Sequence, residues 1–182
     1  MNDPNSSSHA YSAGSDAGDG GSSTYSRPKD GSLLSGEEMA VLEANIDAWL
    51  QDQLHTNPSV LTVDRPEPGY RRWYVRMVGE EKAYSTVWFT LGQRMLHCEC
   101  HFMPAPEENH GRLYEYLLCR NRELAGLRFA IGSEEAIYLL AEVPGHFVTE
   151  AEVDRLLGSY YAYCERWFRP CMRIGYASKF KG

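Results

Sequence analysis

Apolar residues recur at every third or fourth position in three stretches of the chain, and this spacing predicts three amphipathic helices. The first helix is expected to begin after Ser35, where a Ser-x-x-Glu capping box satisfies free backbone N–H groups, and to end before Asn57. The last helix is expected to begin after Thr149 with the same kind of box, and Pro170 is expected to bend or end it.

The middle helix is expected to begin near Glu107, because acidic residues suit the positive start of a helix. It should run to about Ala125, with Gly126 as its C-cap. Its apolar arc is broader than a purely surface helix needs. The residues of this arc are Leu113, Tyr114, Leu117, Leu118 and Leu124.

Between the helices the apolar period changes to two, which is the pattern of half-buried strands. Residues 71–103 predict a three-stranded antiparallel meander, and residues 127–143 predict a second hairpin, with a short extended piece at Val60–Val63 left open. The order α-β-β-β-α-β-β-α places no helix between successive strands of a group. It therefore predicts an α+β fold, an antiparallel sheet packed by helices, rather than a parallel α/β sheet.

Residues 1–32 differ from the rest of the chain because Ser, Gly and Asp dominate them. Such a segment cannot bury enough apolar surface to offset its ordering entropy. The sequence therefore predicts a disordered tail at residues 1–32 and a single folded domain at residues 33–182.

The formal net charge of −7 argues against a dedicated nucleic-acid binder or a protein of anionic membranes. No apolar run approaches the ~18 residues that a membrane span requires. The five cysteines form no CxxC pair and no signal peptide is visible, so we expect a soluble protein of the reducing cytoplasm.

One face of the predicted meander mixes aromatic, cationic and small polar side chains. We expect it to bind a protein partner through Arg72, Tyr74, Arg76 and Trp88, because exposed aromatic residues are enriched at protein contacts. Two alternatives remain: a helix or the loop at residues 55–70 covers this face, or the aromatic residues stack on nucleic-acid bases. The absence of an RNP motif and the acidic balance disfavour base stacking.

The segment His97–His101 holds five potential metal ligands in five positions. On a strand, however, Cys98 and Cys100 point away from the two histidines, which themselves lie about 13 Å apart. That separation is too large for one zinc ion with bonds of about 2 Å. We therefore predict no metal. The sequence also contains no G-x-S-x-G motif and no glycine-rich phosphate-binding motif, so we predict no cofactor and no catalytic residue. The alternative is a small-molecule or metal-binding enzyme that uses this strand together with Arg120, Asn121 and Arg122.

Three sequence runs resemble the actinobacterial branch of the YbjN family, which is described as bacterial sensory transduction regulators. They are MPAPEEN at 103–109, RN at 120–121 and RFAIG at 128–132. The resemblance covers about residues 36–182. It implies a fold like that of the class I type III secretion chaperones, small acidic proteins without enzymatic activity that form homodimers and hold extended segments of other proteins.

In that fold the second helix and the second hairpin commonly contribute to dimerisation. The resemblance thus implies a homodimer interface at Leu113, Tyr114, Leu117 and Leu118. It carries no catalytic residue over to this chain. We predict a non-enzymatic accessory or regulatory protein, chaperone-like in its action, that binds another protein and neither nucleic acid nor membrane.

Overall fold

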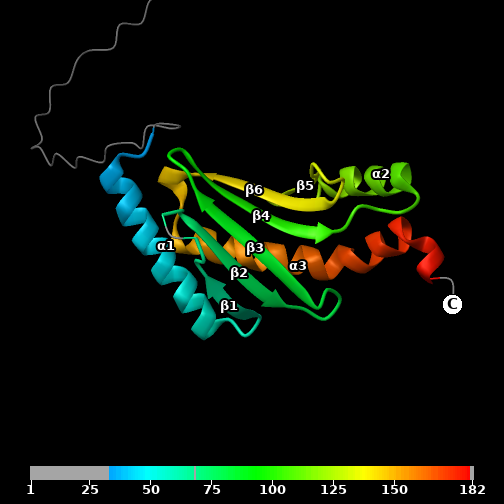
Figure 1. Cartoon of the computed structure of the whole chain (residues 1–182), viewed down its shortest axis with the longest axis horizontal. Coiled ribbons are helices and arrows are strands. Elements are labelled where there is room, and N and C mark those ends of the chain that lie inside the picture. The colour runs from blue at the N-terminus through cyan, green and yellow to red at the C-terminus, as the bar shows by residue number, and fades with distance from the viewer. Residues whose placement is uncertain (1–32, 68, 181–182) are drawn as a thin grey trace, which may run out of the picture.

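The computed structural model of the chain describes residues 33–67 and 69–180 (Figure 1). The tail predicted at residues 1–32 lies outside the described residues. The α-helices are α1 (Gly36–Thr56), α2 (His110–Arg120) and α3 (Glu150–Gly175). The strands are β1 (Val60–Asp64), β2 (Arg72–Val78), β3 (Tyr84–Leu91), β4 (Met95–Met103), β5 (Arg128–Ile131) and β6 (Ile137–Pro144). Short 3-10 helices follow β6 at Gly145–Phe147 and α3 at Ala177–Phe180.

All the strands pair in one antiparallel sheet with the order β1-β2-β3-β4-β6-β5. The predicted α+β class, meander and second hairpin are confirmed. The sheet has one strand more than the predicted order, because the extended piece left open at Val60–Val63 pairs with β2 as an edge strand. The second hairpin joins the meander through β6, which lies beside β4, so β5 forms the other edge.

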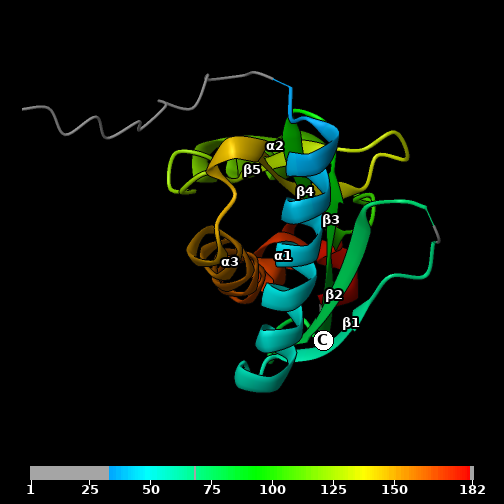
Figure 2. The ribbon, with the colours of Figure 1, turned by 90° about the vertical axis from the view of Figure 1, so that its left-hand side faces the viewer.

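The core lies between the sheet and helices α1 and α3. Alternate residues of the strands point into it, and Trp73, Phe89 and Phe102 are fully buried there. On α3 the buried side chain of Tyr160 donates its hydroxyl proton to the backbone oxygen of Cys98 at 2.8 Å. Figure 2 shows α1 and α3 on one side of the strands, and among residues 33–67 and 69–180 it shows no helix over β2, β3 and β4 on the other side.

Both ends of α2 differ from the sequence expectation. α2 begins at His110 rather than near Glu107, because Asn109 has a left-handed backbone conformation (φ 55°) that a helix cannot include. The N–H groups of Glu107 and Glu108 both donate to the carbonyl oxygen of Gly175 at 3.0 Å. The two glutamates therefore dock on the end of α3 instead of starting a helix. α2 also ends at Arg120, well before Gly126. Pro170 does not end α3, which continues to Gly175.

Candidate protein-binding surfaces

The side of the sheet opposite the core forms the first candidate surface, which we call the open face. Its side chains come from β2, β3, β4 and β6, and each strand contributes every second residue. They are Arg72, Tyr74, Arg76, Thr86, Trp88, Thr90, His97, Glu99, His101, Tyr138, Leu140 and Glu142. The strand pairing thus brings together all four residues of the expected partner site: Arg72, Tyr74, Arg76 and Trp88.

Tyr74 and Trp88 occupy paired positions on β2 and β3, and their rings meet edge to face with centroids 6.0 Å apart. Both side chains are partly exposed. The Tyr74 hydroxyl donates to the Glu67 carboxylate at 2.9 Å, and Arg72 lies 3.6 Å from the same carboxylate. The β1–β2 loop therefore reaches one border of the open face through Glu67. In the described part of the chain, no helix lies over strands β2 and β3, which carry the aromatic pair (Figure 2).

Arg76 extends the open face toward the β2–β3 turn. Its guanidinium lies 4.5 Å from the centroid of the Tyr84 ring, a cation–π arrangement. The Arg76 residue is exposed, and the Tyr84 side chain is about half exposed. This end of the face therefore offers a cation and an aromatic ring to solvent.

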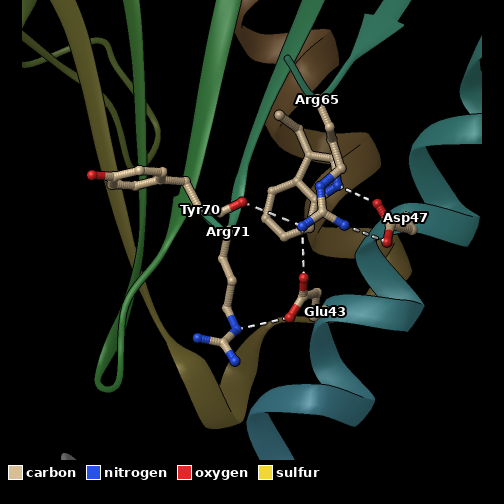
Figure 3. Close-up of polar contacts among 6 residues, drawn as sticks. Glu43, Asp47, Arg65, Tyr70 and Arg71 are labelled. Carbon is tan, nitrogen blue, oxygen red and sulfur yellow. Dashed lines mark hydrogen bonds and ion pairs between the residues drawn. The ribbon is translucent and has the colours of Figure 1, made fainter. Parts of the chain in front are cut away.

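A group of charged side chains, the Arg65 cluster, holds the loop that carries Glu67 (Figure 3). Arg65 lies 2.6 Å from Glu43 and 2.8 Å from Asp47, both on α1, and it stacks over the Trp73 ring at 4.9 Å. Arg71 lies 2.8 Å from the other oxygen of Glu43. Partial burial tends to raise the pKa of Glu43, but the hydrogen bonds from Arg65 and Arg71 together lower it.

Sequence reasoning missed the Arg65 cluster. Glu43 and Asp47 lie four residues apart, so they share one side of α1, and this spacing was the only available signal. Their partners lie about twenty residues further along the chain, so the spacing could not identify them.

The segment His97–His101 lies on β4, and its alternation is as predicted. Cys98 and Cys100 are buried in the core, where burial raises the pKa of Cys98 far above that of a free thiol. On the open face His97 lies 3.3 Å from Glu142, and the His101 ring packs edge to face against Tyr138 at 5.4 Å. Among the described residues no three His, Cys, Asp or Glu side chains are placed to share a metal ion.

The second candidate surface is an apolar groove between α2 and β5. Its lining residues are Tyr114, Leu117, Leu118, Asn121, Phe129, Ala130, Ile131 and Ile137. Of the four residues expected at a dimer interface, Leu113 and Leu117 are 0% and 4% exposed and belong to the core. Tyr114 is partly exposed and Leu118 is 67% exposed, so these two form the accessible part.

Asn121 shapes this groove in a way that the sequence did not indicate. Its amide oxygen accepts the Phe129 N–H at 2.7 Å, and its amide nitrogen donates to the Phe129 carbonyl at 3.4 Å. These backbone groups point away from β6, so Asn121 closes part of the β5 edge.

The neighbour of Asn121, Arg120, pairs with Glu123 and lies 4.8 Å from the Tyr116 ring centroid. Within residues 33–67 and 69–180, no hydrogen bond or ion pair joins the run Arg120–Arg122 to the His97–His101 strand. No polar contact therefore joins the two parts of the alternative enzyme site in the described part of the chain.

Comparisons with known proteins identify mycobacterial relatives that are described as uncharacterised. The chain is 29% identical over 110 residues to the uncharacterised protein ML2442 of Mycobacterium leprae. It is also 29% identical over 104 residues to the uncharacterised protein Rv0487 of Mycobacterium tuberculosis. These alignments cover 60% and 57% of this chain, and the chain spans the same shares of the two relatives.

A chain from the crystal structure of the ExsC-ExsE complex aligns with a TM-score of 0.47 and 16% identity. That alignment covers 70% of this chain and 94% of the other. Within the described residues no helix is long and apolar enough to cross a bilayer. Residues 45–172 match the family YbjN, described as "Putative bacterial sensory transduction regulator". That match spans well over half of the chain, which therefore belongs to the YbjN family.

Proposed function

We propose that this protein is an accessory or regulatory protein that binds an extended segment of another protein on the open face and catalyses no reaction. The observation that carries this proposal is the edge-to-face pair of Tyr74 and Trp88 on a sheet surface that no helix of the described residues covers. A family described as sensory transduction regulators agrees with an action through binding.

The chemistry of the open face suits a protein partner. Aromatic residues and arginine are enriched in protein interfaces, because they offer large contact areas together with hydrogen-bond donors. Tyr74, Trp88 and Arg76 supply these groups, and Thr86 and Thr90 supply small polar groups between them. The free cysteines, of which Cys98 and Cys100 are buried, support a reducing compartment such as the cytoplasm.

We further propose that the α2–β5 groove forms a homodimer interface. Leu118 and Ile131 are 67% and 54% exposed beside the groove, and nearly all of its lining is apolar. In a dimer with a two-fold axis, the exposed apolar side chains of each copy can pack against the apolar groove of the other copy. Such a contact would bury apolar surface that is otherwise exposed to water.

Quantitative affinity capture tests the role of the open face. The full chain, the variant Trp88→Ala and the control Phe147→Ala are used as baits under identical conditions. Phe147 is 48% exposed and lies in the 3-10 helix after β6, away from the open face, so its loss removes a comparable aromatic ring.

We expect proteins that bind the native chain and the Phe147 variant but are lost with Trp88→Ala. Equal recovery with all three baits would contradict the proposal.

A further inference from the structure

We propose that the segment bound on the open face carries a lysine or arginine side chain whose charged group meets Glu99. This inference rests on the proposed function, since it names the chemistry of the partner at the same surface. It is carried by the position of Glu99, by the pairing of the carboxylates around it and by the hollow beside it.

Glu99 lies in the middle of the open face. In the strand register it stands between Trp88 on β3 and Leu140 on β6, and its side chain is partly buried. In the described part of the chain, no hydrogen bond or ion pair to the Glu99 carboxylate is present. A partly buried carboxylate without a hydrogen-bond partner loses solvation that a bound cation could replace.

The carboxylates of Glu67, Glu134 and Glu142, which lie around this face, are paired. Glu67 accepts from Tyr74 and lies near Arg72, and Glu142 lies 3.1 Å from Arg128 and 3.3 Å from His97. Glu134 accepts a hydrogen bond from the Tyr138 hydroxyl. Unlike these three carboxylates, Glu99 has no hydrogen-bond or ion-pair partner among the described residues, and a cation of the bound segment would supply one.

Arg72 is within electrostatic reach of Glu99, but its guanidinium is already committed. Its Nε donates to the Thr90 hydroxyl at 3.1 Å, and its terminal nitrogen lies 3.6 Å from Glu67. A shift of Arg72 to Glu99 would leave Glu67 with the Tyr74 hydroxyl alone. Within the described residues, Arg72 could therefore pair with Glu99 only by breaking an existing contact.

A hollow of about 340 Å³ opens beside Glu99. Ala130, Ile131 and Leu140 contribute apolar surface, and Glu134 and Tyr138 contribute oxygen atoms. Long basic side chains combine an aliphatic stem with a charged end, so the stem can lie on apolar surface while the charge meets a carboxylate. Trp88 stands next to Glu99 in the register and is partly exposed, and an indole ring favours a cation nearby.

Selection from a display library of random short peptides against the full chain tests this inference. Peptides are first sorted by their loss of binding to Trp88→Ala, which identifies ligands of the open face. Their affinities are then measured for Glu99→Gln, which keeps the size of the side chain and removes its charge. Glu150→Gln serves as the matched control, since Glu150 is exposed in the first turn of α3.

We expect the Trp88-dependent peptides to share a lysine or arginine and to bind Glu99→Gln about tenfold more weakly than the native chain. Glu150→Gln should bind them as the native chain does. Replacing a selected arginine by citrulline should weaken binding to the native chain by a similar factor, and this arm needs no protein variant.

Two results would overturn the inference, and they are distinguishable. If Trp88-dependent peptides share no basic residue, or bind Glu99→Gln as tightly as the native chain, the role of Glu99 is wrong while open-face binding stands. If no peptide depends on Trp88, both the inference and the proposed binding surface are contradicted.

Discussion

Asp47 serves the core and the surface at once. One carboxylate oxygen accepts the indole N–H of Trp73, which is fully buried, and the other lies 2.8 Å from Arg65. We predict that Asp47→Ala lowers the free energy of unfolding by about 1–3 kcal/mol, because a buried donor loses its acceptor. Denaturant unfolding measures this change.

Asp52→Ala is the matched control for Asp47→Ala. Asp52 lies exposed on the same helix, so its replacement should change the stability by less than about 0.5 kcal/mol. Equal losses in the two variants would show that the bond to Trp73 contributes nothing.

His101 links stability to pH. Partial burial, and then the charge of Lys82, lower its pKa below the ordinary value of 6.5. The unfolded chain therefore takes up the proton first as the pH falls, so stability present above pH 6.5 is progressively lost below it. We predict that the native chain loses unfolding free energy relative to His101→Gln as the pH falls below 6.5. Denaturant unfolding at a series of pH values measures this difference. Parallel pH curves for the two proteins would contradict this prediction.

At the scale of the elements, the side chain of Asn121 caps the open edge of β5. Asn121 holds both outward backbone groups of Phe129. We predict that Asn121→Leu speeds hydrogen exchange of the Phe129 amide, while Asn121→Asp, which retains an acceptor, keeps much of its protection. Exchange followed by NMR measures both variants, and unchanged exchange in Asn121→Leu would show that the strand edge needs no cover.

Element positions were predictable where a local pattern decides them. The period of two placed Tyr74 and Trp88 on one face and Cys98 and Cys100 on the other, because side chains alternate along a strand. The start of α2 was not predictable, because it depends on the left-handed conformation of Asn109 and on the docking of Glu107 and Glu108 on Gly175, far along the chain. The α2–β5 groove also needed the structure, since only the sheet order shows that β5 is an edge.

At the scale of the whole molecule, the α2–β5 groove predicts assembly. We expect light scattering at micromolar concentration to give about twice the 20.6 kDa mass of the chain. Leu118→Arg should give the single-chain mass, because it places a charge in the apolar contact. The control Leu61→Arg changes an exposed leucine on β1, at the opposite edge of the sheet, and should keep the dimer. A native chain of monomeric mass would contradict the proposed interface.

The central claim is that the open face binds another protein through Tyr74 and Trp88. Calorimetric titration of a purified protein recovered by affinity capture, against the native chain and Trp88→Ala, tests it most directly. We predict an affinity loss of at least about tenfold for Trp88→Ala, as expected for an aromatic residue at the centre of an interface. Equal affinities for the native chain and the variant would contradict the claim.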